Sequence, residues 1–491
     1  MPTSDTAGPS DVTGHRATKA PKSSGRARRE ASELDAVASR PSLWDAALAG
    51  EPVLAERALV STIRDSLYDL IPLSALEVEL IATPEFVRLQ GVKQLGFVYR
   101  VWPGATHTRF EHSLGVYYLM LRALHALRSQ APDLLSGDDT TPQTLLAAAL
   151  LHDVGHYPFS HAIEELGYPV LPHEKVGRLL IEAPAISAVL SRHGLQPGRV
   201  ADLVDPPRDR PLLAEDSLLI RLLSGALDVD KLDYLPRDAR ACNVPYGGVD
   251  VTRLLGSLRV LETTDGARLG VSDKGISPLN SLLHARQEMF DNVYWHHTNR
   301  AMMAMLLRAV QEALEAHAIM PTDLYGHDDS SLLALLGGEG MPEGARALVS
   351  GLRMRQPYKV LLEVSARAGK LFSQLDALFW DQAKRRRVEI ELAAALAEGL
   401  GASVAPYETL VDVPKPEKWE MDVQVRFAQP PIGMVSLMTW AEATGQRPSD
   451  LGVYEQHQRR IRVVASERVR ALAGGSAEAL LLPVLERIPM L

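Results

Sequence analysis

The feature that most constrains this chain is an apolar run that leads directly into a dense group of ionisable side chains. The run LLAAALL at residues 145–151 reads as a helix buried on most of its faces. It is followed by HDVGHYPFSHAIEE at 152–165, which holds three histidines, one aspartate and two glutamates. Polar groups are costly to bury unless they are paired or bound to a metal. The pattern therefore predicts a buried helix that ends in a polar site.

The composition sets the class of protein around this site. A chain of 491 residues predicts two or three domains. The formal net charge of −9 argues against a general nucleic-acid binder, whose domain is usually basic. The single cysteine, Cys242, excludes an internal disulfide and fits a reducing compartment, so we expect a cytoplasmic protein. We see no apolar stretch of membrane-spanning length and no signal-peptide core.

Periodicity divides the chain into three predicted parts. Residues 1–43 are rich in Ser, Thr, Gly, Pro and basic residues, and we expect a disordered basic tail there. Residues 44–320 have mostly helical periodicity, and residues 321–491 mix helices with short strands. The sequence predicts helices over 109–127, 141–155, 219–235 and 279–314, and a β-hairpin over 258–272. The predicted fold class is mainly α: a helical bundle with a short β-hairpin, followed by a smaller α+β C-terminal region.

Four residues on these apolar helices form a candidate metal site: His112, His152, Asp153 and Asp230. Two imidazoles and two carboxylates make a mixed nitrogen and oxygen set that suits a borderline or hard divalent ion. Such an ion can lower the pKa of a bound water and polarise a phosphoryl oxygen. Taken singly, each histidine is more often a core or surface residue and each aspartate more often a cap or an ion-pair partner. Taken together, the four residues favour a metal.

Several motifs in this order resemble the HD-domain phosphohydrolases, and most closely the deoxynucleoside triphosphate triphosphohydrolases. The motifs are TPEFVRLQGVKQLGFVYRVWPGATHTRFEH, LLHDVGHYPFSHAIEE, PHEKVG, GALDVDKLDYLPRDA and LHARQEMFDNVYWHHTNR, and they span roughly residues 55 to 310. The resemblance implies an HD-domain helical bundle. It also implies metal-dependent cleavage of a dNTP into a deoxynucleoside and inorganic triphosphate. The divalent metal would be Mn, Mg, Fe or Zn.

The resemblance also implies the roles of the catalytic residues. His112, His152, Asp153 and Asp230 match the metal ligands. His161 matches the catalytic histidine, which would protonate the 5′-oxygen leaving group, and Glu164 matches a carboxylate that orients it. His156 and His173 match histidines that line the phosphate path, with support of the metal ligands as the alternative.

Substrate contacts follow from the same matches. Arg109, Lys231 and Arg286 fall on positions that contact the phosphates. The positions that contact the sugar and base are Tyr234, which would crowd a 2′-hydroxyl, Asp238 and Gln94, which would hydrogen-bond the 3′-hydroxyl, and Tyr294. The sequence departs from better-known members at Phe290, where they carry a histidine, and at His297, where they carry a lysine.

Two classes of function fit these residues. The first is an enzyme that hydrolyses dNTPs, or an HD phosphatase that acts on another nucleotide. The second is a nucleotide sensor, for instance in a regulatory or defence complex, that keeps the pocket for binding. The complete set of metal ligands together with His161 favours the enzyme, because a sensor needs no general acid. We expect a homo-oligomer, either a dimer or a tetramer, with no membrane and no nucleic-acid partner.

Overall fold

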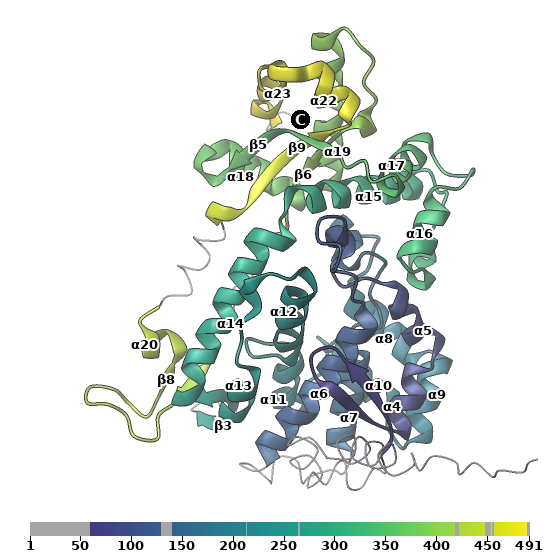
Figure 1. Ribbon diagram of the computed structural model, residues 1–491. Helices are drawn as coiled ribbons and strands as arrows, with labels where there is room; N and C mark the ends of the chain where they lie inside the picture. The colour runs from purple at the N-terminus through teal and green to yellow at the C-terminus, as the bar shows by residue number, and fades with distance from the viewer. Residues whose placement is uncertain are drawn as a thin grey trace, which may run out of the picture. The chain divides into compact units, whose positions relative to one another are not determined.

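The computed structural model describes residues 59–128, 140–212, 214–263, 266–417, 422–446, 453 and 456–488 (Figure 1). These residues belong to one compact unit that runs from Pro52 to Leu491. The predicted tail over residues 1–43 lies outside the described residues. The described chain is mainly helical and carries a few small sheets, which confirms the predicted fold class.

The helices that form the centre of the first region are α6 (Arg109–Arg128), α7 (Thr141–Leu151), α8 (His173–Glu182), α10 (Pro197–Val204) and α12 (Val229–Cys242). Helix α6 packs on both α7 and α12, whereas α10 packs between α7 and α8. Helix α7 has its Leu and Ala side chains buried on every face, because other helices surround it. The prediction of a buried helix before the polar site is therefore confirmed.

The predicted helix over 219–235 is in fact two helices, α11 (Ala214–Leu223) and α12. The break has a local cause: the Asp228 side chain accepts a hydrogen bond from the backbone nitrogen of Lys231 and so caps the start of α12. Gly225 lies in the break, where an added Cβ would be 2.7 Å from the backbone oxygen of Arg221. The new start places Asp230 in the first turn of α12.

The predicted helix over 279–314 is also interrupted. It consists of α14 (Ile276–Met289), a π-helical turn η7 (Phe290–Tyr294) and α15 (His297–Glu315). Single π-helical turns inside helices occur frequently at functional sites. Here the turn carries Phe290 and Tyr294, and both side chains line the cavity described below.

Three small sheets complete the described fold. Strands β1 (Leu59–Asp65) and β2 (Asp69–Ser74) form a hairpin that the sequence analysis did not predict. The predicted hairpin is confirmed as β3 (Leu258–Thr263) and β4 (Gly266–Ser272). Strand β7 (Gln424–Arg426) pairs with β4 in parallel, and β8 (Leu437–Thr439) extends the same sheet. The third sheet has the order β5 (Lys359–Ser365), β9 (Arg460–Ala465), β6 (Thr409–Asp412).

The remaining helices follow the same plan of buried apolar faces. They are α4 (Ala75–Ile81), α5 (Pro84–Val87), α9 (Pro184–Arg192), α13 (Val251–Ser257), α16 (Asp329–Leu336), α17 (Glu343–Arg353), α18 (Lys370–Asp376), α19 (Gln382–Leu400), α20 (Trp440–Thr444), α22 (Glu467–Ala473) and α23 (Ala477–Glu486). Apolar side chains of α18, α19, α22 and α23 form one core with strands β5, β6 and β9.

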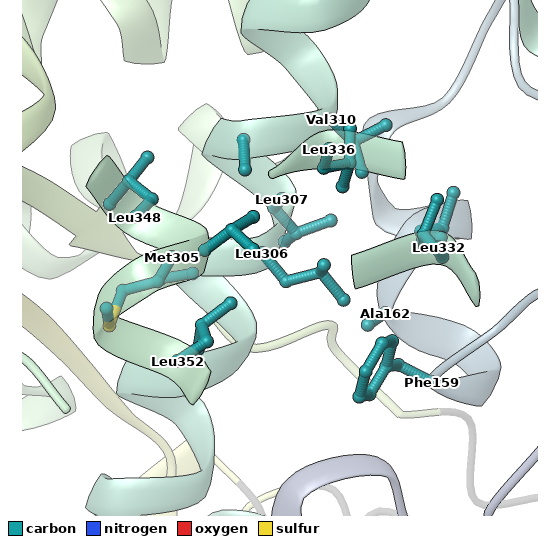
Figure 2. Close-up of a cluster of buried hydrophobic side chains, with 14 of the residues drawn as sticks. Phe159, Ala162, Met305, Leu306, Leu307, Val310, Leu332, Leu336, Leu348 and Leu352 are labelled. Carbon is teal, nitrogen blue, oxygen red and sulfur yellow. The ribbon is translucent and has the colours of Figure 1, made fainter. Parts of the chain in front are cut away.

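A second hydrophobic core fixes the segment that follows the polar motif. Figure 2 shows Phe159 and Ala162 beside the leucines of α15, α16 and α17, which belong to the same cluster of buried side chains. Phe159 is 3% exposed and its ring stacks on that of Phe97, with 4.4 Å between the ring centres. Because Phe159 is anchored in this core, the residues on either side of it are held in place.

Candidate active site

The four predicted metal ligands converge at the ends of three helices. His112 lies in the first turn of α6, His152 and Asp153 follow α7, and Asp230 lies in the first turn of α12. The Nε2 atom of His112 is 3.0 Å from Asp230 Oδ1 and 3.5 Å from Asp153 Oδ2. The Nε2 atom of His152 is 3.3 Å from Asp153 Oδ1 and 3.8 Å from Asp230 Oδ1. His112, His152 and Asp230 have ligand atoms within 4.8 Å of one another, and Asp153 lies beside both histidines. We call these four residues the His/Asp group.

The Nδ1 atoms of His112 and His152 contact acceptors that are not members of this group. His112 Nδ1 is 2.8 Å from Asp233 Oδ2, and His152 Nδ1 is 2.9 Å from the backbone oxygen of Ala149. These contacts favour the tautomers in which Nδ1 carries the proton and Nε2 presents its lone pair, as in metal-binding histidines. Both Nε2 atoms are buried, and among the described residues they face the carboxylates of Asp153 and Asp230 rather than a partner outside the group. Such a set of inward-facing donors fits a divalent metal ion.

Asp233 is a residue that the sequence analysis missed. It is fully buried, and it accepts hydrogen bonds from Tyr68 Oη at 2.7 Å and from Arg237 Nε at 2.8 Å. Arg237 in turn donates to Asp65 at 2.8 Å. Gly115 leaves the room for this network, because a Cβ there would lie 1.9 Å from Asp233 Oδ1. The network holds the carboxylate that orients His112.

The electrostatics of this group follow from burial and charge. Burial alone lowers the pKa of His112, but the carboxylates of Asp230 and Asp233 raise it to about 10. Burial alone raises the pKa of Asp153, but the guanidinium of Arg109 and the neighbouring histidines hold it well below its usual value. A bound metal would replace the proton on His112 Nε2, so metal binding at this site is coupled to proton release.

A second group of ionisable residues lies beside the first. His156, His161, Glu164 and His173 have ligand atoms within 4.8 Å of one another. Glu164 connects two of the rings, because its Oε1 is 2.7 Å from His173 Nδ1 and its Oε2 is 3.3 Å from His161 Nδ1. The rings of His156 and His173 are stacked, with 3.8 Å between their centres. We call these four residues the histidine cluster.

Burial affects the members of the histidine cluster differently. Burial alone raises the pKa of Glu164, but the charge of His173 and the hydrogen bonds from His161 and His173 hold it well below its usual value. Burial alone lowers the pKa of His173, but Glu164 raises it to about 9. Burial, together with the charges of Arg109 and His173, lowers the pKa of His156 well below its usual value. His161 has the most exposed side chain of the four, at 60%.

Backbone geometry brings this cluster together. Phe159 and Ser160 both have positive φ, 60° and 58°, which is costly for residues other than glycine. Asp329 holds the turn by accepting a hydrogen bond from the backbone nitrogen of Phe159 at 2.7 Å. Gly155 allows α8 to approach closely, because a Cβ there would lie 2.1 Å from the backbone oxygen of His173. The absence of a side chain at Gly155 therefore allows His173, in the next motif, to lie beside His156 and His161.

Each predicted phosphate-binding cation is paired with a carboxylate. Arg109 donates to Asp153, and Lys231 donates to Asp228. The guanidinium of Arg286 is 2.8 Å from Glu417 Oε2. A triphosphate therefore has to compete with these carboxylates for the positive charges.

The predicted sugar-binding residues also lie together. Asp238 is buried and lies within 2.7 Å of Tyr294 Oη. Gln94 is 7% exposed, and its Oε1 has no hydrogen-bond partner within the part of the chain that the structure describes. Burial raises the pKa of Tyr234, even though the charge of Arg286 opposes this, so the phenol is neutral at pH 7.

One cavity of about 580 Å³ joins these groups, a size within the usual range for ligand pockets. The cavity is lined by all the predicted site residues except His112, which is fully buried: Gln94, Arg109, His152, Asp153, His156, His161, Glu164, His173, Asp230, Lys231, Tyr234, Asp238, Arg286 and Tyr294. Lining residues that the sequence analysis did not select include Arg300, Phe379, Trp380, Lys415 and Glu417. Most of these come from the C-terminal region, where the sequence carries no motif.

The two departures from the family pattern have different positions. Phe290 lines the cavity, and its ring lies against the guanidinium of Arg286, with 5.3 Å between the ring centre and Cζ. A cation–π contact therefore occupies the position where a histidine is expected. His297 is not among the residues that line the cavity.

Comparison with protein families places this arrangement in a class. Residues 109–235 match the HD domain, and residues 249–473 match the HD associated region. The chain therefore contains an HD domain followed by an HD associated region, which agrees with the resemblance that its motifs carry. None of the helices in the described residues is long and apolar enough to cross a membrane.

The chain is also similar to individual proteins over about half of its length. The chain is 33% identical over 277 residues to uncharacterized protein MJ1154 of Methanocaldococcus jannaschii, covering 56% of this chain and 55% of the relative. It is 32% identical over 284 residues to human deoxynucleoside triphosphate triphosphohydrolase SAMHD1, covering 52% of this chain and 45% of that protein. The chain thus spans about half the length of the curated relatives it matches.

A solved structure supports the fold. The crystal structure of a hypothetical protein from Aquifex aeolicus aligns with a TM-score of 0.65 and 24% sequence identity. The alignment covers 86% of this chain and all of the other.

Proposed function

We propose that this protein hydrolyses deoxynucleoside triphosphates to deoxynucleosides and inorganic triphosphate. The observation that carries the proposal is the cavity itself. It joins the His/Asp group, the histidine cluster, three cations and the sugar-binding residues in one space. Each of these groups serves a different part of a dNTP. The similarity to a deoxynucleoside triphosphate triphosphohydrolase supports the same substrate class.

The first part of the mechanism is the placement of the α-phosphate. His112, His152, Asp153 and Asp230 would hold a divalent ion, because the two buried Nε2 atoms lie against the carboxylates of Asp153 and Asp230. When bound, such an ion supplies a polarised phosphoryl oxygen and a more acidic water. Arg109, Lys231 and Arg286 would exchange their carboxylate partners for phosphate oxygens.

The second part is the departure of the 5′-oxygen. An alkoxide is a poor leaving group unless it is protonated, so the reaction needs a general acid. His161 suits this role because its side chain lines the cavity while its Nδ1 contacts Glu164. With Nδ1 engaged by the carboxylate, Nε2 is left to face the substrate. His156 and His173 pack against His161 and limit its movement.

Product analysis tests the proposal directly. Each dNTP and NTP is incubated with Mn²⁺ or Mg²⁺, and nucleoside, nucleoside monophosphate, pyrophosphate and triphosphate are separated. We expect intact triphosphate in equal amount to the deoxynucleoside. Pyrophosphate together with a nucleoside monophosphate would overturn the mechanism. Tight nucleotide binding without turnover would favour the sensor, and turnover of other nucleotides alone would favour a different HD phosphatase.

Two further parts of the proposal concern the state of the protein. We propose that it acts as a homo-oligomer, which equilibrium sedimentation of the full chain tests. We also propose a cytoplasmic location, which is supported by the single cysteine, Cys242, because one cysteine forms no internal disulfide.

A further inference from the structure

His107 is a buried residue next to the cavity that no part of the mechanism above uses. It lies in the loop that precedes α6, and its side chain is 8% exposed. Two of its atoms contact residues assigned to the sugar. Its Nε2 is 2.7 Å from Asp238 Oδ1, and its backbone oxygen accepts a hydrogen bond from the backbone nitrogen of Gln94 at 3.0 Å. One residue thus contacts both positions proposed to bind the 3′-hydroxyl.

The contact with Asp238 determines what that carboxylate can still accept. His107 engages Oδ1 and Tyr294 engages Oδ2, each at 2.7 Å. A carboxylate offers about four lone-pair positions. Two therefore remain, and Asp238 lines the cavity where they can accept a hydrogen bond from a hydroxyl group. The two contacts fix the plane of the carboxylate before substrate arrives.

The contact with Gln94 acts on the other side of the same subsite. The pairing of its backbone with the His107 loop extends one residue further, because Lys93 and Thr108 form an isolated β-bridge. Gln94 also lines the cavity, and its buried Oε1 is without a hydrogen-bond partner among the described residues. Buried polar groups usually have partners, so this one points to a ligand that completes the subsite.

We infer that His107 is a positioning residue for recognition of the 3′-hydroxyl, a role that rests on the proposed function. Its imidazole holds the Asp238 carboxylate, its backbone oxygen holds the backbone of Gln94, and both residues line the same cavity. A site built to hydrogen-bond a substrate hydroxyl discriminates strongly against an analogue that lacks it. Without His107, Asp238 keeps one of its two fixed contacts and the discrimination falls.

A purely structural role is the competing explanation, because the same contact ties the loop to α12. The two roles differ in what they change. A structural contact affects the thermal stability of every complex equally. A positioning contact changes the preference for a 2′-deoxynucleoside triphosphate over the 2′,3′-dideoxy analogue, which differs only at the hydroxyl concerned.

The test compares kcat/KM for dNTP and ddNTP of the same base in four full-length proteins. His107→Leu removes the hydrogen bond, and His107→Gln restores an N–H donor at a similar reach. His193→Leu is the matched control, because His193 makes a comparable contact with Glu79, 3.0 Å from Nε2 to Oε1, outside the cavity. Thermal unfolding of each protein is measured in parallel.

We expect His107→Leu to lower the dNTP/ddNTP ratio at least tenfold, about 1.4 kcal/mol, mainly through KM for the dNTP. His107→Gln should recover most of the ratio, and His193→Leu should keep the wild-type ratio whatever its melting temperature. An unchanged ratio in a folded His107→Leu protein, or no wild-type preference for dNTP over ddNTP, overturns the inference while leaving dNTP hydrolysis intact. A wild-type protein that turns over neither substrate overturns the proposed function and this inference with it.

Discussion

The His/Asp group and the histidine cluster are both built from imidazoles and carboxylates, yet their hydrogen bonds run in different directions. In the His/Asp group the Nδ1 atoms of His112 and His152 contact acceptors outside the group, Asp233 and Ala149. In the histidine cluster the Nδ1 atoms of His161 and His173 contact Glu164, a member of the cluster. In each group the ligand atoms of three or more residues lie within 4.8 Å of one another, which is the spacing of a metal site.

The difference separates two chemical tasks. Histidines that are held from outside turn their lone pairs inward, which suits a metal ion. Histidines that are held by their own carboxylate keep their protons within the cluster, which suits the transfer of a proton. Spacing alone does not distinguish the two, whereas the partner of each Nδ1 does. We therefore expect one tightly bound ion per chain, in the His/Asp group.

The largest expected effect is in the His/Asp group. Asp153→Ala should abolish metal binding and turnover together, because Asp153 faces both histidines of the group and also pairs with Arg109. Metal content by atomic spectroscopy and dNTP turnover are measured on the same sample. Retention of the ion at wild-type affinity would show that the ligands lie elsewhere. Glu174→Gln, which alters an exposed carboxylate beside the histidine cluster, is the control and should keep its ion.

The next largest expected effect is a loss of kcat without a loss of metal, which distinguishes the histidine cluster from the His/Asp group. His161→Ala should lower kcat by about 10²–10⁴-fold, the usual contribution of a positioned general acid, and leave the metal content unchanged. The measurement is kcat at saturating substrate with the ion quantified per chain. A loss below tenfold assigns the acid role to another residue. Loss of a second ion in this variant would show that the histidine cluster is itself a metal site.

A smaller expected effect, on metal affinity, tests how the imidazole of His112 is oriented. Asp233→Asn keeps the shape of the side chain but removes the charge that His112 Nδ1 contacts. Partners of metal-bound histidines typically contribute about 10–100-fold to affinity, so we expect metal affinity to fall by this amount. Competition with a chelator measures the change. Asp202→Asn is the control, because Asp202 is a buried carboxylate that pairs with Arg178 and Arg210 away from the cavity.

The sequence predicted the members of the His/Asp group, but it did not predict the residues that hold them in place. Helix α6 was predicted at 109–127 and observed at 109–128, because its apolar periodicity is long and regular. Asp233 was missed, although it lies three residues after Asp230 on the same helix. Its role depends on contacts with Tyr68 and His112, which are distant in the sequence. The roles of the individual site residues stay predictions that the variants above test.

The same limit applies to the break points of helices and to the C-terminal region. The helix predicted at 219–235 is divided in two. A new helix starts where Asp228 caps it, and this local cap outweighs a continuous apolar pattern. Trp380, Lys415 and Glu417 reach the cavity through tertiary packing, and short motifs carry no information about such approach. The motifs therefore predicted cavity residues within their own span, and missed those that the C-terminal region supplies.

The last expected effect is on folding: the histidine cluster makes stability depend on pH. Glu164 holds the pKa of His173 at about 9, above its ordinary value near 6.5, so this contribution is complete below pH ~6.5 and is lost as the pH rises through about 9. The pKa of Glu164 is depressed, so its contribution is present above its ordinary value and is lost as the pH falls. Between pH ~5 and ~6.5 both contributions are complete.

Glu164→Gln should therefore lower the free energy of unfolding by about 2 kcal/mol near pH 6, and by less at pH 9.5 and at pH 3.5. Urea unfolding at constant metal concentration gives these differences. Glu174→Gln is the matched control, because Glu174 is 3.6 Å from the same His173 but its side chain is 47% exposed, and exposed ion pairs contribute little. A difference for Glu164→Gln that is largest at pH 9.5 would mean that His173 is neutral in the folded protein.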